Sequence, residues 1–560
     1  MNIIGISAFY HDSSACLFKD GKLVFACEEE KFTGIKHDSS FPHKTLEHIF
    51  KTFKLNKDNI DVVCYYEDPR LKYGRVMENL KGQFLKNPLY SLKSYLKIIK
   101  NFKTLDKLLP TISKNIFYST HHESHMYYSI FTSPYDNAVC LSIDGVGEYD
   151  TAVFGAYNKK IGYTSLGRYP HSLGLFYSAM TSFLGFKPNE GEYKVMGLAP
   201  YGNPDIYIDK VRKLVAFKNG RLECNMECFT WNKSDKEMFG YNLYKLLDLD
   251  LRKPSEPIEQ IHKDLAASVQ KRYEEVLFDM LKSINIVMPV YNNLSLAGGC
   301  AYNGSANGKI IDKTNFEHLW IPPAPSDAGS AIGACIHYLS KNNTLPGKVT
   351  KNPFLGPIYY NSTIYSAIKT HKHKRFVYEH KLLKHVAKLI KEGKVVGWFQ
   401  GHCEFGSRAL GNRSILADPT AEGMKDRINA VIKKREGFRP FAPMVTKEKQ
   451  HEFFELVDDV PYMNQVVKVK PEYIDKLKSV THVDGTARVQ TVYKNMFIHN
   501  LLIEFEKLSG FPVLLNTSFN IKDKTMVLTP QDAVDTFLDT EMDVLVIENY
   551  VIYKNYEKNI

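Results

Sequence analysis

Two buried strands that each end in a loop of small and acidic residues constrain the fold of this chain most strongly. The first covers residues 138–145 and the second covers residues 294–299. Glycine after a strand lets backbone N–H groups approach a bound ligand closely. Together with a strand hairpin at the start of the chain, these two junctions predict a twofold-related nucleotide-binding core over about residues 1–345.

The opening hairpin is predicted from two apolar runs, residues 3–9 and 14–18, and from a third run at residues 22–27. A Lys-Asp-Gly turn at residues 19–21 joins the second run to the third. Asp-Gly between two strands is typical of a tight β-hairpin. The order of strand, tight polar turn and strand suits an actin-like ATPase core, in which the first turn faces phosphate.

The length of 560 residues predicts at least two domains. A polar segment that contains Pro and Gly, residues 340–358, predicts the boundary between them. We therefore expect α/β domains at residues 1–345 and 358–560, and residues 381–399 of the second have the pattern of a helix followed by a strand. Residues 203–260 are expected to form an insertion or accessory lobe.

The composition is that of a globular protein, with 44% hydrophobic and 24% charged residues, which excludes pervasive disorder. The net charge of +11 is spread over the chain without a block of about five or more like charges, so we predict no nucleic-acid partner. Nine scattered cysteines, several within apolar runs, indicate a reducing compartment. The start of the chain lacks the features of a signal peptide, and we find no apolar stretch long enough to span a bilayer. These features predict a cytoplasmic protein.

A candidate metal site begins with His121 and His125, which are four residues apart and share one face of a helix. By itself this spacing also fits a pair of ordinary histidines. Asp144 ends the first buried strand, and Asp327 stands at the head of a helix rich in small residues. Two histidines and two aspartates leave open positions for substrate oxygens and suit a ferrous or similar transition ion.

A second candidate centre lies in the C-terminal part, where residues 433–439 include four cations and are followed by a stiff Pro-containing stretch. Cations anchored in this way suit a phosphate, because Arg offers two parallel donors and Lys a point charge. A strand that breaks into small hydroxyl and amide side chains at residues 516–520 is a further candidate anion site. A solvated charged surface is the alternative interpretation of the cation run.

Taken together, the motifs resemble the nodulation-protein-U and antibiotic O-carbamoyltransferase family nearly from end to end. Their order and their spacing both fit that family. The matching segments are residues 5–15, 28–38, 121–125, 144–148, 191–202, 298–303, 406–414, 433–440 and 518–520.

The resemblance implies an N-terminal actin-like domain, shared with the tRNA threonylcarbamoyl-transfer enzymes, and a C-terminal YrdC-like α/β domain. In such enzymes the C-terminal domain uses carbamoyl phosphate and ATP, as a Mg²⁺ complex, to make carbamoyl adenylate. The adenylate then passes to the N-terminal domain, where a hydroxyl of a small-molecule or sugar acceptor attacks it, as in natural-product biosynthesis. A homodimer is expected by the same analogy.

The resemblance also implies roles for individual residues of the first domain. Four would hold a divalent metal ion, Fe²⁺ by analogy: His121, His125, Asp144 and Asp327. Four would line the pocket for the adenylate nucleotide: Gly145, Gly298, Gly299 and Asn303. His11 and Lys36 would flank the carbamoyl carbon, with His11 as the base that accepts the proton of the acceptor hydroxyl.

In the second domain the resemblance implies five residues that hold carbamoyl phosphate and the phosphates of ATP: Lys433, Arg439, Arg488, Ser518 and Asn520. The sequence departs from the family pattern at His402 and Ser407, where Arg and Pro are expected. The loss of a fixed cation there would alter nucleotide affinity, although Glu404 and Arg408 of the same segment are present.

Two other functions fit part of the pattern. A tRNA threonylcarbamoyl-transfer enzyme shares both domain types, but it needs a broad basic surface for RNA. A non-catalytic nucleotide-binding protein with an actin-like core has no use for the four candidate metal ligands or for the cation run. We therefore expect an ATP-dependent O-carbamoyltransferase.

Overall fold

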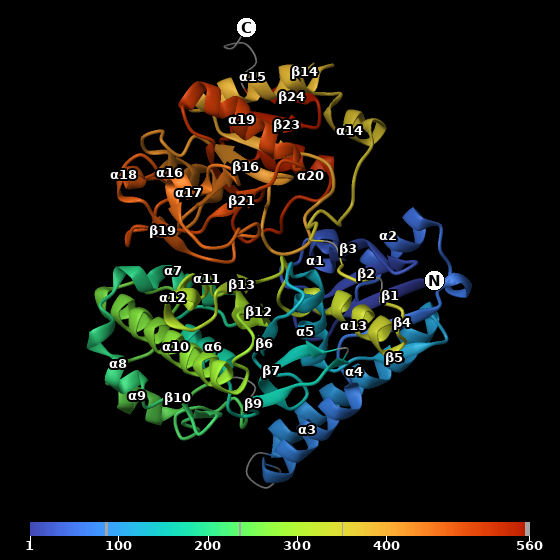
Figure 1. Ribbon diagram of the computed structural model, residues 1–560, viewed down its shortest axis with the longest axis vertical. Helices are drawn as coiled ribbons and strands as arrows, with labels where there is room; N and C mark the ends of the chain where they lie inside the picture. The colour runs from blue at the N-terminus through green and yellow to red at the C-terminus, as the bar shows by residue number, and fades with distance from the viewer. Residues whose placement is uncertain (84–87, 159, 235–236, 346, 350, 555–560) are drawn as a thin grey trace. The chain divides into compact units, whose positions relative to one another are not determined.

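The computed structural model describes residues 1–83, 88–158, 160–234, 237–345, 347–349 and 351–554 (Figure 1). Its contacts divide the chain into two compact units. The first unit comprises Met1–Glu29 and His37–Lys351, and the second comprises Glu30–Lys36 and Asn352–Ile560. The short segment Glu30–Lys36 therefore groups with the C-terminal part, which no sequence pattern indicates.

The first sheet of the first unit has the strand order β3-β2-β1-β4-β5. β1 pairs antiparallel with β2 and parallel with β4. Asp20 and Gly21 join β2 to β3 with φ of 48° and 75°, which is the left-handed backbone that a tight hairpin turn requires. The predicted hairpin is confirmed. The strands are β1 (Asn2–Ser7), β2 (Ser14–Lys19), β3 (Lys22–Glu28), β4 (Val62–Tyr65) and β5 (Ile116–Tyr118).

The second sheet has the strand order β13-β12-β6-β7, with β9 and the short β8 (Lys160–Ile161) paired to β7. Leaving out β8, strands numbered in chain order within each sheet follow 3-2-1-4-5 in both sheets. This repetition confirms the twofold-related, actin-like α/β core. The other strands are β6 (Val139–Ile143), β7 (Asp150–Asn158), β9 (Thr164–Arg168), β12 (Asn293–Ala297) and β13 (His318–Trp320).

Two helices lie between these sheets and carry candidate site residues: α5 (His121–Thr132) and α13 (Asp327–Lys341). The two helices pack against each other, and α13 also packs on β1 (Figure 1). The approach is close because α13 carries glycine at the contact. A Cβ at Gly333 would overlap the carbonyl oxygen of Ser124, and one at Gly329 would overlap the ring of Tyr128. The small residues of this helix therefore allow backbone-to-backbone packing.

Residues 203–260 form short elements that adjoin α10 (Gln260–Val287). α8 (Ile208–Val211) and β10 (Val215–Lys218) both pack on α10, and β10 pairs with β11 (Arg221–Cys224). α9 (Tyr241–Leu247) follows. α6 (Leu173–Phe183) and α7 (Glu192–Leu198) also contact α10, so the lobe is continuous with the first unit.

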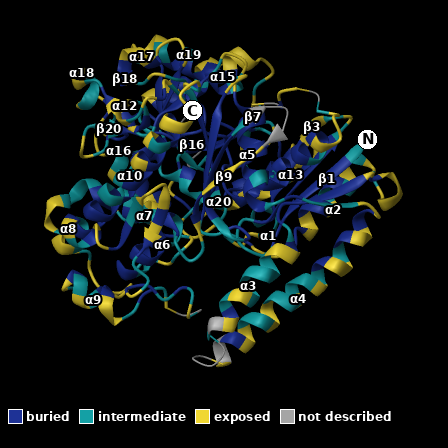
Figure 2. Ribbon diagram, turned by 60° about the horizontal axis from the view of Figure 1, so that its bottom comes forward, coloured by how far each residue is buried: buried dark blue, intermediate teal, exposed yellow. Residues whose placement is uncertain are grey.

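Two long helices, α3 (Pro69–Gln83) and α4 (Pro88–Ile112), pack on each other in the first unit. Many residues of these helices are exposed or half-buried, whereas β1 is almost wholly buried (Figure 2). Among the described residues, no helix is both long enough and apolar enough to cross a membrane.

The second unit contains an eight-stranded sheet in the order β14-β24-β23-β15-β16-β22-β17-β21. One apolar core lies under α15 (Glu379–Lys391) and α19 (Phe497–Ser509), and another lies under α14 (Asn361–Ile368) and α20 (Pro530–Leu538). The predicted helix and strand of residues 381–399 are confirmed as α15 and β15 (Val396–Phe399).

The remaining strands of this sheet are β14 (His373–Arg375), β16 (Arg413–Ala417), β17 (Ala442–Thr446), β21 (Gln490–Val492), β22 (Val513–Ser518), β23 (Val544–Ile547) and β24 (Tyr550–Tyr553). A three-stranded sheet of β18 (Phe454–Glu455), β19 (Val467–Val469) and β20 (Thr486–Ala487) lies in the same unit. The C-terminal domain is therefore a mixed α/β layer structure.

Candidate functional site

Four buried side chains meet in the first unit: His121 and His125 from the start of α5, Asp144 from the end of β6, and Asp327 from the start of α13. One ligand atom from each lies within 4.8 Å of the others. The Nε2 atom of His125 is 3.0 Å from Oδ2 of Asp144 and 3.2 Å from Nε2 of His121. The structure thus brings together the four predicted metal ligands.

Asp327 contributes a fully buried carboxylate to this cluster. In the described part of the chain, neither of its carboxylate oxygens has a hydrogen-bond partner, and neither has Nδ1 of His121. The nearest imidazole nitrogen to Asp327 is Nε2 of His125, at 3.5 Å. A buried carboxylate is costly unless it is paired or coordinates a metal, so this donor set fits a cation.

Groups behind the four ligands hold them in place. Ser330 Oγ lies 2.9 Å from Nδ1 of His125, which directs Nε2 of that ring toward the aspartates. The backbone N–H groups of Gly145 and Gly299 donate to Asp144, at 2.6 and 3.1 Å. Two of the predicted nucleotide-pocket glycines therefore lie directly at the cluster and orient one of its carboxylates.

Glu148 fixes the start of α5. Its carboxylate accepts from the backbone N–H of His121 at 2.9 Å and from that of Asp68 at 2.8 Å. A negative charge at this end of a helix is favourable. Burial raises the pKa of Glu148, against the opposing charge of His121. The sequence motif of residues 144–148 thus contributes a candidate metal ligand, Asp144, and the carboxylate of Glu148 that binds the start of α5.

The charges of the cluster are strongly coupled. Burial raises the pKa of Asp144, but hydrogen bonds from His121 and His125 outweigh it and hold that pKa well below its ordinary value. Burial lowers the pKa of His125, but Asp144 and Asp327 outweigh it and raise the pKa to about 9. The four groups therefore act as one electrostatic unit.

His122 lies beside the two ligand histidines but has a structural role. Its Nδ1 is 2.8 Å from Ser142 Oγ, and its Nε2 is 2.9 Å from the carbonyl oxygen of Asp150. Burial and the neighbouring histidines lower its pKa to about 3, so the ring is neutral. Both ring nitrogens are occupied, and this separates His122 from the four candidate metal ligands.

His11 adjoins the cluster, with Nε2 3.9 Å from Oδ2 of Asp327. Its Nδ1 is 2.9 Å from one oxygen of Asp12, and the other oxygen of Asp12 is 2.7 Å from Nδ1 of His37. Burial lowers the pKa of His11, but Asp327 and Asp12 outweigh it and raise the pKa to about 10. The left-handed φ of 51° at both Asp12 and His37 marks a strained backbone around this network.

The other two predicted nucleotide-pocket residues have different surroundings. Gly298 has a φ of 84°, and a Cβ there would overlap the carbonyl oxygen of Ile143, so the loop passes close to β6. Asn303 accepts from the backbone N–H of Ala306 and exchanges side-chain hydrogen bonds with Gln270 at 3.0 and 3.1 Å. Asn303 therefore joins the loop after β12 to α10.

In the second unit, Lys433 lies at the end of a π-helical turn (Ile428–Lys433) and is buried. Its ammonium donates to the hydroxyl and carbonyl oxygens of Ser518, at 3.2 and 2.6 Å, and to the side-chain and carbonyl oxygens of Asn520, at 2.6 and 2.9 Å. Burial lowers its pKa, as do the charges of Arg435 and Arg439. The structure thus joins three of the five predicted C-terminal site residues.

Arg488 is the centre of a group of arginines. Burial lowers its pKa, and the positive charges of three other arginines lower it further. Its Nε atom is buried and, among the described residues, lacks a hydrogen-bond partner. The arginines that surround it electrostatically are Arg408, Arg435 and Arg439. Such a concentration of positive charge suits an anion.

Two members of this group, Arg408 and Arg435, were missing from the predicted site. Arg435 stands two residues after Lys433, donates from Nε to Asn429 at 2.7 Å and lies over the ring of Phe441 at 4.6 Å. The Lys-x-Arg spacing of Lys433 and Arg435 is the sequence signal that could have indicated Arg435. Lys36 lies in the segment that groups with the second unit, and its charge also lowers the pKa of Lys433.

Glu404 stabilises the loop that contains the two departures from the family pattern. Its Oε1 accepts from three backbone N–H groups between 2.8 and 3.0 Å: those of Leu410, Asn412 and Arg413. Lys31 donates to the carbonyl oxygens of Glu404 and Gly406. His402 and Ser407 are both exposed, and Nδ1 of His402 lies 2.8 Å from the carbonyl oxygen of Gly356.

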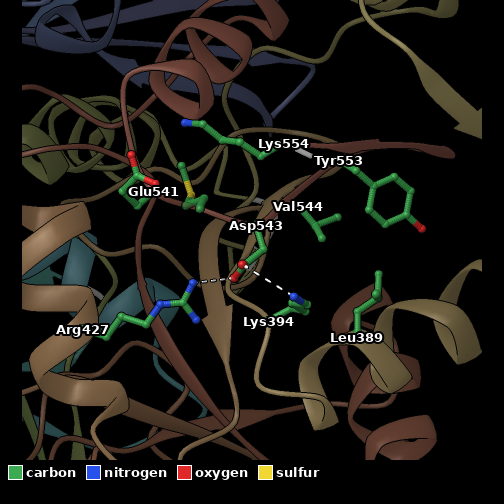
Figure 3. Close-up of a pocket in the computed structure, with 9 residues that line it drawn as sticks. Leu389, Lys394, Arg427, Glu541, Asp543, Val544, Tyr553 and Lys554 are labelled. Atoms are coloured by element: carbon green, nitrogen blue, oxygen red, sulfur yellow. Dashed lines mark hydrogen bonds and ion pairs between the residues drawn. The ribbon is translucent and has the colours of Figure 1, made fainter. Parts of the chain in front are cut away.

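A separate cavity of about 260 Å³ in the second unit is lined by charged residues (Figure 3). Arg427 donates to Asp543 at 2.8 Å, and Lys394 lies 4.0 Å from the other oxygen of that carboxylate. These opposite charges pair within the protein, and none of the predicted site residues lines the cavity. It differs in this respect from the arginine group around Arg488.

Two family models match the N-terminal and the C-terminal parts of the chain separately. Residues 2–336 match the family described as carbamoyltransferase N-terminus, and residues 387–554 match the family described as carbamoyltransferase C-terminus. The chain is 38% identical to an uncharacterized protein of Synechocystis sp., over 99% of this chain and 97% of that protein. It is 35% identical to the nodulation protein NolNO of Sinorhizobium fredii, over 98% of this chain and 80% of that protein.

A weaker likeness exists to a crystal structure of full-length HypF in a phosphate- and nucleotide-bound form. The TM-score is 0.31 and the identity is 14%, over 62% of this chain and 47% of that one.

Proposed function

The chain belongs to the carbamoyltransferase family, and on this premise we propose that it is an ATP-dependent O-carbamoyltransferase. The second unit would hydrolyse carbamoyl phosphate to carbamate and phosphate, and would then join carbamate to ATP to give carbamoyl adenylate and pyrophosphate. The first unit would transfer the carbamoyl group to a hydroxyl of a small-molecule or sugar acceptor. One observation carries the proposal: each unit has a charged group with buried atoms that lack a hydrogen-bond partner among the described residues, namely both carboxylate oxygens of Asp327 and Nε of Arg488.

The proposed division of labour follows from the chemistry of the carbamoyl group. A carbamate is a poor electrophile, because its nitrogen and its anionic oxygens donate electrons to the carbon. Adenylation gives the carbon a good leaving group. The phosphates of both substrates are anionic, so the cations around Arg488 are the proposed binding groups for them.

Within that site Lys433 would act as a point charge whose position is set by Ser518 and Asn520. Arg439 and Arg488 would supply planar pairs of donors for phosphate oxygens. We add Arg435 and Arg408 to the proposed site, because their charges reach the Arg488 guanidinium. ATP would enter as its Mg²⁺ complex.

In the first unit His121, His125, Asp144 and Asp327 are the proposed ligands of a divalent cation, with Fe²⁺ as the proposed ion. When bound, such an ion stabilises the negative charge that grows on the leaving phosphate. The fit is supported by the unpartnered oxygens of Asp327 and by Ser330, which sets the tautomer of His125. Gly145, Gly298, Gly299 and Asn303 would form the walls of the nucleotide pocket.

His11 is the proposed base for the acceptor hydroxyl. Asp12 binds its Nδ1, which leaves Nε2 directed toward the cluster. Because Asp327 and Asp12 raise the pKa of His11 to about 10, the proposed role depends on the cation that offsets the carboxylate of Asp327. Lys36 is the proposed contact to the carbamoyl group.

The decisive test is ATP–pyrophosphate exchange by the purified full chain, together with analysis of its metal content. We expect exchange that requires carbamoyl phosphate. Mass-spectrometric screening of candidate alcohols for the gain of a carbamoyl group would then identify the acceptor. Absence of carbamoyl phosphate-dependent exchange from protein with its metal fully loaded would overturn the proposal.

A further inference from the structure

A tight turn precedes Arg488 in the second unit. The backbone N–H of His482 donates to the carbonyl oxygen of Thr486 at 2.7 Å, and that of Gly485 donates to the carbonyl oxygen of His482 at 3.0 Å. Thr486 also begins β20, which leads directly into Arg488. The turn therefore fixes the imidazole of His482 relative to the central arginine of the anion site.

Hydrogen bonds determine which nitrogen of His482 carries the proton. The single hydroxyl proton of Thr486 is donated to the carboxylate of Asp484, at 2.6 Å. The hydroxyl oxygen of Thr486 is therefore an acceptor toward Nδ1 of His482, which lies 3.0 Å away. Nδ1 carries the hydrogen, and Nε2 presents its lone pair.

The lone pair on Nε2 has no donor within the protein. Among the described residues, Nε2 of His482 is buried without a hydrogen-bond partner. Burial and the charges of Arg488 and Lys425 outweigh Asp484 and lower the pKa of His482 to about 4, so the ring stays neutral near pH 7. A buried acceptor that is left unsatisfied is costly, and such a group in a native protein calls for a partner.

The neighbours of His482 define the kind of partner. Lysine and arginine side chains carry only donors, and the arginines around Arg488 therefore match the phosphate oxygens of a ligand. An acceptor in such surroundings matches a ligand that carries both an anionic group and an N–H. Carbamoyl phosphate has both, since its carbonyl carbon bears an NH₂ group.

We propose that Nε2 of His482 accepts a hydrogen bond from the carbamoyl NH₂ group and thereby selects carbamoyl phosphate among acyl phosphates. This inference rests on the proposed function, because it assigns a specificity-determining residue to the carbamoyl phosphate site. Acetyl phosphate is the matched comparison. It has the same shape and phosphate, but a methyl group replaces the NH₂ group and cannot donate.

Two conservative variants separate the contact to the ligand from the contact to Thr486. In His482→Gln the side-chain amide reaches the position of Nε2, so an acceptor remains there while the link to Thr486 is lost. In His482→Asn the amide reaches only the position of Nδ1, so the link to Thr486 remains while the acceptor is lost. The dissociation constants of carbamoyl phosphate, acetyl phosphate and inorganic phosphate would be measured for the full chain by calorimetry.

We expect the wild type to bind carbamoyl phosphate about tenfold more tightly than acetyl phosphate, as for one buried hydrogen bond. His482→Asn should lose this preference and His482→Gln should keep most of it, with the affinity for inorganic phosphate unchanged in both. Equal binding of the two acyl phosphates by the wild type would overturn the inference and leave the proposed function intact. A uniform loss of affinity for all three ligands in His482→Asn would also overturn it, since that indicates a structural role.

Failure of the wild type to bind any of the three ligands has a different meaning. It would overturn the proposed carbamoyl phosphate site itself, and the assignment of His482 with it.

Discussion

The two candidate centres of this chain differ in the sign of the charge that they concentrate. Around Asp327 the first unit gathers carboxylates and imidazoles, whereas around Arg488 the second unit gathers guanidinium groups. In each centre at least one buried charged group has an atom without a partner among the described residues. The cavity next to Asp543 is different, because there Arg427 and the carboxylate neutralise each other.

This difference teaches how a binding site can be told from a structural ion pair. Burial of a charge is costly, and a stable protein normally compensates it internally. Where two separate clusters of charged side chains each keep a buried atom without a partner among the described residues, each is best explained as a site for a ligand of the opposite charge. The following predictions test that explanation, first in the anionic cluster and in the arginine group, and then in the residues behind them.

The largest effect is expected from Asp327→Asn. The change removes one ligand charge and should lower the affinity for the divalent ion by more than about 100-fold, beyond the 10–100-fold expected for residues behind the ligands. Carbamoyl transfer should fall with it. Metal content after dialysis against a metal buffer, followed by transfer assays, would measure both.

The same variant also tests the link between Asp327 and the neighbouring imidazoles without metal. Because Asp327 raises the pKa of His11 and of His125, both pKa values should fall in the metal-free variant, which NMR titration of the imidazole protons would measure. Carbamoyl phosphate-dependent ATP–pyrophosphate exchange should be retained, since that reaction is assigned to the second unit. Loss of exchange would contradict the separation of the two centres.

The next largest effect is expected from Arg488→Met. Loss of the central guanidinium should weaken binding of carbamoyl phosphate by about 30-fold, as for a charged hydrogen-bonding group. Arg427→Met is the matched control, because it removes an arginine from the same unit that pairs with Asp543. Calorimetry should show an unchanged affinity for the control; equal weakening in both variants would indicate a general loss of positive charge.

A smaller effect is expected from Ser330→Ala. Without the hydroxyl at Nδ1, the ring of His125 loses its fixed tautomer, and the affinity for the divalent ion should fall by about tenfold. Ser326→Ala, at the N-cap of the same helix, is the control, because among the described residues its hydroxyl is buried without a hydrogen-bond partner. Metal titration of both variants would show whether the hydroxyl position matters.

The smallest effect concerns the dependence of stability on pH. The pKa of His482 is lowered in the folded protein to about 4, below its ordinary value. Its contribution to stability is therefore complete above about pH 6.5 and is lost as the pH falls toward 4. Since part of the residue is accessible, we expect about 1 kcal/mol from this group.

Chemical denaturation of the wild type and of His482→Gln at pH 7 and pH 4.5 would measure this contribution. The variant should lose less stability between the two pH values than the wild type. An equal loss in both proteins would mean that His482 is protonated in the folded state as readily as in the unfolded chain.

Local patterns made a large part of the fold predictable. The Asp-Gly turn at residues 20–21 and the apolar strands on either side of it are short-range signals, and the hairpin follows them. The two strand-to-loop junctions are of the same kind. The arrangement of two sheets with the same strand order could be predicted, because the strand-to-loop pattern occurs twice in the sequence.

The candidate site was predictable only where residue type and spacing decide it. His121 and His122 are neighbours on one helix, yet Ser142 and Asp150 occupy both nitrogens of His122 and leave Nδ1 of His121 unpartnered among the described residues. Nothing in the helix sequence indicates which ring these distant groups will bind. The charged run of residues 433–439 does not indicate which of its arginines lie near Arg488, and the structure brings the charges of both Arg435 and Arg439 there.

The grouping of Glu30–Lys36 with the second unit depends on tertiary contacts alone. Lys31 donates to the carbonyl oxygens of Glu404 and Gly406, which are far away in the sequence. No periodicity or composition marks such a segment, because its partners are backbone oxygens of a loop.

The glycines of α13 have a consequence for how this centre can change. Because α5 and α13 meet through backbone atoms at Gly333 and Ser124, no side chain at that joint can be lengthened or shortened to adjust the separation of the histidines from Asp327. The distance between the candidate ligands is therefore set by the main chain. A variant of the protein that prefers another ion would therefore need different ligand residues at the same backbone positions. It could not reach that preference by changing the distance between α5 and α13.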